Sequence, residues 1–380
     1  MRIGPLEVER RNVPPWSWTL AVSILAILVA LGLAGVIFWS YGVSPLHAYG
    51  VIIRGTLNPR ALPEIVRNMI PLLLAGVGLV LAFRALFWNI GAEGQILLGA
   101  TAATWVALYS PVPDPLKLPA MFAAGFLGGA AWGLIPAVLK LRFSVNEVIS
   151  TLMMNYIALY LVSGLVHGPW KGNEMRGFAF TDAFPRAAQI PLIPGTRIHW
   201  ITLLLGVALA IGTAFLLKRT RAGFEIRVQG ENPEAARYAG IDPVRTLLVV
   251  MFIAGGTAGL AGVGEAAGIH RRLLDPNQIS LGFGYAAIIV AWLARGSPLA
   301  VLVTSLFLGI IFASGDVMRV ALQMPARVTD VFNGLILFCL IGSERLLYWR
   351  VRWLPERTVR GPAPEAGTGR EATGASGSDS

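Results

Sequence analysis

The chain has little of the residue types that build disulfide frameworks or metal centres. It holds one cysteine, Cys339, so no disulfide can form within the chain. Its four histidines lie far apart and match no metal-ligand spacing; they are His47, His167, His199 and His270. We therefore expect no metal site and no cofactor.

Charged residues are also scarce, at 14% of 380 residues, where a soluble domain carries about a quarter. Hydrophobic residues make up 55% and the mean hydropathy is +0.65, which indicates a polytopic membrane protein. The net charge of +10 does not indicate nucleic acid, because the basic residues are spread between apolar runs without an aromatic-basic patch.

Signatures of ATP binding and of catalysis are missing. None of the four lysines follows a glycine, so the chain has no P-loop. No nucleophile elbow, zinc-protease motif or paired-carboxylate pattern stands out. We expect no enzyme, and if transport uses ATP, a separate subunit hydrolyses it.

Apolar runs of membrane-spanning length alternate with polar connectors. They predict an all-α polytopic membrane protein with about ten transmembrane helices, near 16–39, 63–86, 96–109, 120–139, 146–164, 200–217, 246–268, 281–294, 298–315 and 328–347. A cleaved signal peptide is the rival for the first run, but its core is too long and no small-x-small cleavage site follows.

The charge distribution sets the expected topology. With ten spans, 19 of the 31 lysines and arginines fall on the side that holds both termini, which the positive-inside rule places in the cytoplasm. We expect a cytoplasmic segment 1–15, a permease domain 16–349, and a basic, disordered cytoplasmic tail 350–380. The loop 218–245 is then cytoplasmic and the loop 167–199 extracytoplasmic.

Glycine spacing suggests how the helices pack. Gly125, Gly129 and Gly133 share one face, which allows close helix approach and predicts a central position for that helix. A glycine-rich helix followed by a short or interrupted one occurs at 71–109 and again at 251–294. This weak pseudo-repeat predicts two related halves with a transport site near the membrane midplane.

The polar stretch 217–246 contains a complete signature of a short helix. Asn232 suits the N-cap, Pro233 the first helical position, Glu234 the positive helix end, and Gly240 a left-handed C-terminal closure. So short a helix is marginal unless something packs on it. It is either a helix that lies in a partner's groove or a capped helix in a solvated loop.

FWNIGAEGQ is the most unusual stretch at membrane depth. Asn89, Glu93 and Gln95 are costly near hydrocarbon, and two glycines between them loosen the helix. One interpretation is a polar lining or hinge of a translocation path. The other is that Asn89 only caps the following helix.

Further polar residues lie within later spans. Thr151 and Asn155 share a helix face, where Asn155 either bonds a neighbouring helix or contacts substrate. Glu265 either binds a polar ligand or pairs with Arg271. Ser144 and Glu147 predict a capping box at the start of the fifth span.

Three motifs in order resemble one transporter family. Glu234-Ala235-Ala236, three residues, then Gly240 is similar to the EAA loop of ABC-transporter permeases. The phrases GENPEAARYAGI, NIGAEGQ and NEVISTLMMNYIALYL resemble the branch that carries nucleosides and simple sugars, related to ribose and branched-chain amino-acid permeases. The Leu-Pro that ends the longer EAA pattern of many permeases is absent.

The resemblance implies a permease subunit of an importer in a bacterial plasma (inner) membrane. Its implied partners are ATPase subunits, a second permease that is often a non-identical sister, and an extracytoplasmic substrate-binding protein. It implies docking of the ATPase on a coupling helix made by Glu234, Ala235, Ala236, Arg237, Tyr238 and Gly240. The implied mechanism is alternating access for a nucleoside or simple sugar.

Alternatives stay open at this point. The chain is a permease for branched-chain amino acids or another small polar solute, or a stand-alone secondary transporter. A secondary transporter needs an embedded proton or sodium relay, for which Glu93 and Glu265 are the deep candidates. An intramembrane enzyme lacks a credible catalytic constellation.

Overall fold

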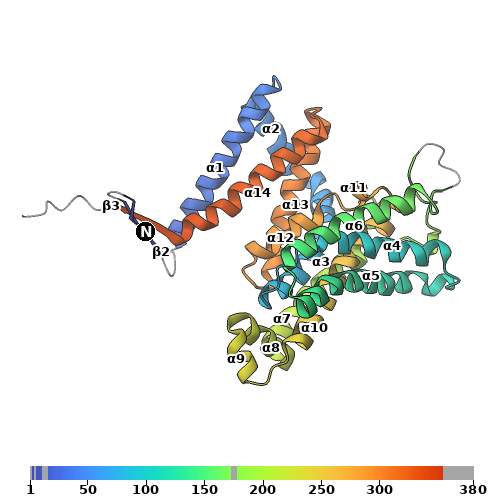
Figure 1. The fold of residues 1–380 in the computed structure, drawn as a ribbon. Helices are drawn as coiled ribbons and strands as arrows, with labels where there is room; N and C mark the ends of the chain where they lie inside the picture. The colour runs from blue at the N-terminus through green and yellow to red at the C-terminus, as the bar shows by residue number, and fades with distance from the viewer. Residues whose placement is uncertain (1, 4–5, 11–15, 173–177, 354–380) are drawn as a thin grey trace, which may run out of the picture. The chain divides into compact units, whose positions relative to one another are not determined.

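A computed structural model describes residues 2–3, 6–10, 16–172 and 178–353. Within these residues the chain is mostly helical (Figure 1), with fourteen α-helices, two 3-10 turns and one π-helical segment. The strands Arg2–Ile3 (β1), Leu6–Arg10 (β2) and Trp349–Trp353 (β3) form an antiparallel sheet in the order β1-β2-β3. Most of the predicted disordered tail lies outside the described residues.

The chain divides into two units. One is Leu31–Leu337, and the other combines Met1–Ala30 with Phe338–Ser380 and contains the sheet. Every site discussed below lies within Leu31–Leu337.

The helices run in the following order. They are α1 (Trp16–Ser40), α2 (Pro45–Thr56), α3 (Leu62–Arg84), α4 (Ala92–Tyr109), α5 (Asp114–Phe143), α6 (Glu147–His167), α7 (Trp200–Arg219), α8 (Arg221–Glu231), α9 (Pro233–Tyr238), α10 (Pro243–Val263), α11 (Pro276–Ile279), α12 (Phe283–Leu293), α13 (Ala300–Ala321) and α14 (Ala326–Tyr348). The 3-10 turns are η1 (Pro59–Ala61) and η2 (Arg186–Ala188), and the π-helical segment is η3 (Gly264–His270).

Six helices in the described residues are long and apolar enough to cross a membrane, and the pair α1 and α2, bent by 113°, makes up to seven. The six are built on α3, α5, α6, α7, α10 and α13. All ten predicted runs are helical, but α12 has only 11 residues, too few to cross alone. The multi-pass membrane fold is therefore confirmed, while the count of ten spans stays a prediction.

Helix α3 forms the centre of the bundle. Of its most apolar 18-residue window, 94% is buried, against 33% for α5. The glycine spacing therefore identified a contact face of α5 correctly, but its expected central position was wrong. Helix α5 is buried along the face of its three glycines, while most residues on its other faces are partly or fully exposed.

Close packing of α4, α5 and α10 depends on glycines. A Cβ atom on Gly259 would lie 2.2 Å from the Gly125 carbonyl oxygen, and one on Gly99 would lie 2.3 Å from the Gly259 Cα. No side chain fits at these distances, so the three backbones touch directly. The glycine spacing in the sequence predicted the contact face of α5, but not which helices pack against it.

The start of α6 differs from the predicted capping box. Ser144 lies in the left-handed region (φ 53°) at the end of α5, and Asn146 is the N-cap of α6. The Asn146 side chain accepts hydrogen bonds from two backbone N–H groups at 2.9 and 3.3 Å. Glu147 instead forms an ion pair with Lys140 at 2.6 Å.

Candidate functional site

The predicted short helix is present as α9, at one end of the bundle. The Asn232 side chain accepts hydrogen bonds from the N–H groups of Glu234 and Ala235, both at 3.0 Å. Gly240 follows with φ +72°, the left-handed closure that the sequence predicted. In Figure 1, α8 and α9 project below α7 and α10; we call this the α9 end of the bundle.

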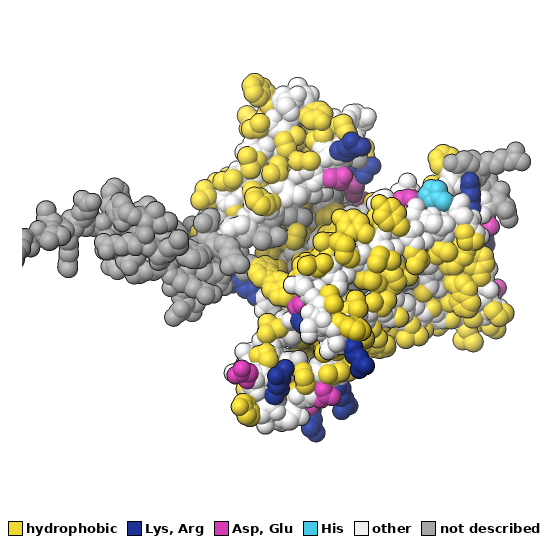
Figure 2. All heavy atoms as spheres, viewed as in Figure 1, with side chains coloured by type: hydrophobic (Ala, Val, Ile, Leu, Met, Phe, Trp, Pro, Cys, Tyr) yellow, Lys and Arg dark blue, Asp and Glu magenta, His cyan; other side chains and the backbone are white. Residues whose placement is uncertain are grey.

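Most of α9 faces away from the bundle. Ala236 is buried at 2% exposure, whereas the Tyr238 side chain is 94% exposed. Glu234, Ala235 and Arg237 are exposed as well. Figure 2 shows charged side chains gathered at this end and hydrophobic side chains over the neighbouring helices. A large aromatic ring on a two-turn helix is thus left without cover in this chain.

Helix α8 connects α9 tightly to the membrane helices. A Cβ atom on Gly230 would lie 1.8 Å from the Arg84 carbonyl oxygen at the end of α3. One on Gly223 would lie 2.0 Å from the Leu216 carbonyl oxygen of α7. Backbone meets backbone at both contacts, so α8 packs directly on α3 and α7.

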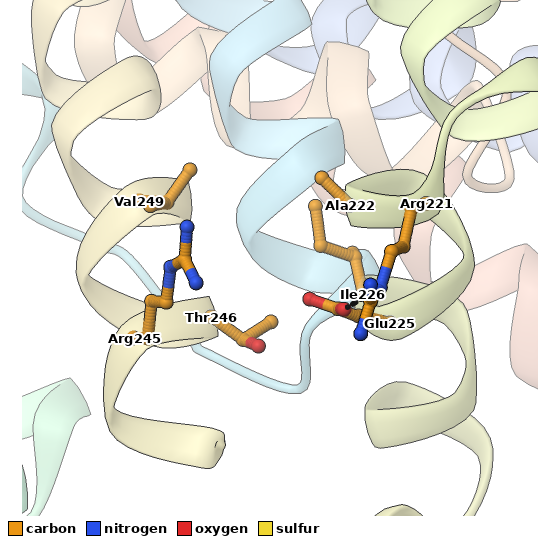
Figure 3. A pocket seen from close by; sticks show the side chains of 7 residues that line it. All are labelled: Arg221, Ala222, Glu225, Ile226, Arg245, Thr246 and Val249. Carbon is orange, nitrogen blue, oxygen red and sulfur yellow. Dashed lines mark hydrogen bonds and ion pairs between the residues drawn. The ribbon is translucent and has the colours of Figure 1, made fainter. Parts of the chain in front are cut away.

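A pocket of about 430 Å³ separates α8 from α10 beside α9. Figure 3 shows the residues that line it, Arg221, Ala222, Glu225 and Ile226 from α8 and Arg245, Thr246 and Val249 from α10. Arg221 and Glu225 form an ion pair at 3.2 Å. The lining mixes charged and apolar side chains from the two helices, so the pocket is a groove between α8 and α10.

The NIGAEGQ stretch forms a folded polar loop before α4. The side-chain amides of Asn89 and Gln95 exchange hydrogen bonds at 3.1 and 3.2 Å, and both residues are buried. Asn89 also accepts from the N–H of Gly91 at 3.0 Å, while Gly91 itself is the N-cap of α4. Asn89 therefore stabilises the turn before α4 instead of occupying its N-cap.

Thr151 and Asn155 of α6 hold this same loop. Ile90 donates its N–H to the Thr151 hydroxyl at 3.2 Å. Asn155 accepts from the Gly94 N–H at 2.9 Å and donates to the Ile90 carbonyl at 2.8 Å. The shared helix face predicted from the sequence is thus an inter-helix contact between α6 and the start of α4.

Glu93 joins α4 to the beginning of α12. Its two carboxyl oxygens accept hydrogen bonds from the N–H groups of Gly282 at 3.2 Å and Gly284 at 2.7 Å. Helix α12 is short and follows a break after α11, so its first N–H groups need such an acceptor. The short helix predicted near 281–294 therefore begins at a carboxyl group that α4 supplies as its hydrogen-bond acceptor.

Glu265 forms a buried ion pair at the other end of the bundle. It lies on η3 and pairs with Arg67 of α3 at 2.9 Å, with both side chains at most 7% exposed. Arg67 also donates to Asn68 at 2.8 Å, and His270 lies 3.9 Å from Glu265. The expected pairing of Glu265 with Arg271 was wrong. Arg271 is the left-handed C-cap of η3, whereas Glu265 lies at its start and contacts α3.

A cavity of about 810 Å³ opens beside this ion pair. Its charged and polar lining comes from α3, α13, η3, α11 and the loop before α7; these residues are Glu64, Arg67, Arg197, His270, Gln278, Asp316 and Arg319. Two of the lining residues carry a buried nitrogen atom without a hydrogen-bond partner, Arg67 Nε and His270 Nε2. The cavity offers both donors and acceptors to a polar solute.

Arg67 is not among the residues predicted above, although the sequence carries a signal for it. Arg67 and Asn68 interrupt an apolar run shortly after its start, as Glu265 interrupts another. A charge inside a membrane helix requires a partner. Two such charges of opposite sign, each near the same end of antiparallel helices, predict a pair.

The fold and these polar groups at membrane depth define a multi-pass membrane transport protein. The family model described as "Branched-chain amino acid transport system / permease component" matches residues 62–341, and the chain belongs to this permease family. The branch expected from the three sequence motifs is confirmed.

Named relatives cover nearly the whole chain. It is 36% identical to the glucose ABC transporter permease protein of Haloferax volcanii, over 96% of this chain and 97% of that one. It is 30% identical to the guanosine ABC transporter permease protein of Bacillus subtilis, over 87% and 95%. A nucleoside ABC transporter permease protein of Lactococcus lactis is 29% identical, over 83% and 89%.

Proposed function

We propose that the chain is a permease subunit of an ABC importer and that α9 is its coupling helix to a separate ATPase. The observation that carries this proposal is the arrangement of α9, which is rigidly capped by Asn232 yet leaves Tyr238 94% exposed. A capped helix with an uncovered aromatic ring suits a groove on a partner. Glu234, Ala235, Ala236, Arg237 and Gly240 complete the proposed docking element.

Movement passes from α9 through α8 in this proposal. The contacts of Gly230 with α3 and of Gly223 with α7 transmit ATPase closure to two membrane helices. Helix α3 also carries Arg67, so the same rigid body reaches the ion pair at the opposite end. Alternating access then changes the contact of α3 with Glu265 when α9 is displaced.

The proposed path runs from the outer cavity past the interior polar groups. Glu265 borders the entry, and the candidates deeper in the membrane are Asn89, Glu93, Gln95, Thr151 and Asn155. In this conformation the deep groups bond one another or nearby backbone, as when Glu93 accepts from α12. The path is therefore closed here, and these residues exchange partners when it opens.

We infer a nucleoside or simple sugar as substrate, imported with the help of an extracytoplasmic binding protein. The relatives are named for glucose, guanosine and nucleosides. Mixed donors and acceptors in the outer cavity suit a solute with several hydroxyl groups. A second permease, identical or a non-identical sister, completes the path.

The proposed topology follows the charge distribution. Ten spans cross a bacterial plasma membrane, with the segment 1–15, the loop 218–245 and the tail 350–380 in the cytoplasm. The permease domain is 16–349, and its loop 167–199 lies outside, where a binding protein docks. This orientation puts the α9 end on the cytoplasmic side.

Co-purification with co-expressed ATPase subunits tests the coupling role. We expect the wild-type chain to retain the ATPase and a Glu234→Arg, Gly240→Pro variant to lose it. The first change reverses an exposed charge, and the second forces φ away from the observed +72°. The wild-type chain and this double variant must both still insert in the membrane.

A tyrosine pair provides the matched control. Tyr238→Ala removes an exposed ring from α9, and Tyr41→Ala removes one, 55% exposed, from the turn after α1. Only the first should reduce ATPase retention. If no ATPase binds the wild type, or if both tyrosine variants bind equally, α9 is a plain connector and the stand-alone transporter becomes the better explanation.

A further inference from the structure

A second pocket at the α9 end is lined by three cations and by no carboxylate. It measures about 320 Å³, and its basic residues are Arg84 from the end of α3, Lys218 from the end of α7 and Arg227 from α8. Within the described residues, no ion pair joins any of the three to an acid. Three converging like charges repel one another unless an anion lies between them.

The site is built, because Arg84 is held in place. Its Nε donates to the Gly296 carbonyl at 2.9 Å. Gly296 has φ +73°, and a Cβ atom there would lie 2.4 Å from Arg84 Nε. The backbone turn before α13 thus fixes the guanidinium of Arg84 at the pocket.

The rest of the lining is apolar and sits where membrane helices end. Leu217, Pro298 and Leu299 form the wall beside the cations. The membrane-length helices that end in Arg84 and Arg219 stop here, and the one that starts at Ala300 begins here. A pocket at three span ends lies at the depth of lipid headgroups, with its apolar wall toward the acyl chains.

We propose that this pocket binds the phosphate of an anionic membrane phospholipid. The cations of α3, α7 and α8 surround the phosphate, and the apolar wall contacts the first carbons of the chains. The lipid then connects α8 to the ends of α3 and α7, and so restricts movement of α8, which leads directly into α9. The groove of Figure 3 differs, because Glu225 already pairs with Arg221 there.

Native mass spectrometry of the purified full-length chain tests this proposal. The probes are phosphatidylglycerol and phosphatidylcholine, titrated separately onto delipidated protein. We expect the wild-type chain to bind phosphatidylglycerol at least about tenfold more tightly than phosphatidylcholine. The double variant Lys218→Gln, Arg227→Gln should lose most of that preference. The control double variant Arg221→Gln, Arg245→Gln removes two charges from the neighbouring groove and should keep the preference for phosphatidylglycerol.

Other outcomes overturn the proposal. Equal retention of the two lipids, or an equal loss in both double variants, means that the pocket is not a specific headgroup site. Displacement of the lipid by millimolar inorganic phosphate means that a soluble anion is the ligand. If the Lys218→Gln, Arg227→Gln variant loses only co-expressed ATPase, the cations serve that protein instead. The α9 variants test coupling separately, because none of them alters this pocket.

Discussion

Two polar regions at opposite ends of the bundle are built in contrasting ways. At one end, Arg67 and Glu265 are buried and pair with each other at 2.9 Å. At the other end, α9 is closed by its own caps, but Tyr238 touches almost nothing. In the first region the two opposite charges pair within the chain, and in the second region an aromatic side chain is exposed on the surface. Removing a group should therefore cost stability at the first and association at the second.

The largest loss of stability is expected from Glu265→Ala. It leaves the Arg67 guanidinium buried without its counter-ion, which costs about 3–5 kcal/mol. The measurement is thermal or denaturant unfolding in detergent. Arg197→Ala is the control, because the Arg197–Glu64 pair spans 3.8 Å with side chains 55% and 37% exposed, so its loss costs at most about 1 kcal/mol. Equal effects would show that burial of the Glu265 pair is not decisive.

A smaller loss is expected from Glu93→Ala. The N–H groups of Gly282 and Gly284 lose their acceptor, at about 2–3 kcal/mol in total. Hydrogen exchange should rise at the start of α12 while α5 is unchanged. The Glu93→Gln variant retains one carbonyl acceptor, so its hydrogen exchange at the start of α12 should lie between that of the wild type and that of Glu93→Ala. Unchanged exchange in α12 would contradict the bridging role of Glu93.

Gly230→Ala sharpens the comparison at the α9 end. Its Cβ would lie 1.8 Å from the Arg84 carbonyl, so α8 must move away from α3, at about 1–2 kcal/mol. Gly212→Ala in α7 meets nothing within 4 Å and should be neutral or slightly stabilising. We expect ATP hydrolysis of the assembled transporter to uncouple from transport only in the Gly230 variant. Normal coupling there would exclude this contact as the route.

The smallest effect on stability is expected from Tyr238→Ala. Because the ring is 94% exposed, the unfolding free energy should change by less than about 0.5 kcal/mol. Retention of the ATPase should nevertheless fall by about tenfold or more, as for an aromatic hot spot. A destabilised variant would instead mean that Tyr238 packs within this chain.

Local signals in the sequence predicted local structure well. The caps of α9, the glycine contact face of α5 and the helical character of every apolar run could be predicted from residue type and spacing. The predicted capping box at Ser144 is wrong because Ser144 ends α5 and Asn146, an equally good N-cap two residues later, begins α6. Neighbouring candidates for one cap differ by less free energy than tertiary packing contributes.

Partners distant in the sequence were harder to predict. The sequence offers nearby Arg271 as an ion-pair partner of Glu265, but Glu265 pairs with Arg67. It also gives no sign that the Glu93 carboxyl group accepts a hydrogen bond from the start of α12. The same limit applied to the centre of the bundle, where α3 displaced α5. Residue spacing shows which side chains share a face of one helix, but it does not show which helices contact each other.

The sequence by itself determined that this chain is a helical membrane transport protein of the permease family, because hydropathy and short motifs act over a few turns of helix. The tertiary structure decided which polar groups bond each other, which cavities remain and which ring on α9 is left uncovered. Those properties depend on helix approach, and helices approach where glycines let their backbones meet. Only the folded bundle brings α3 within hydrogen-bonding distance of η3, and α4 within hydrogen-bonding distance of α12.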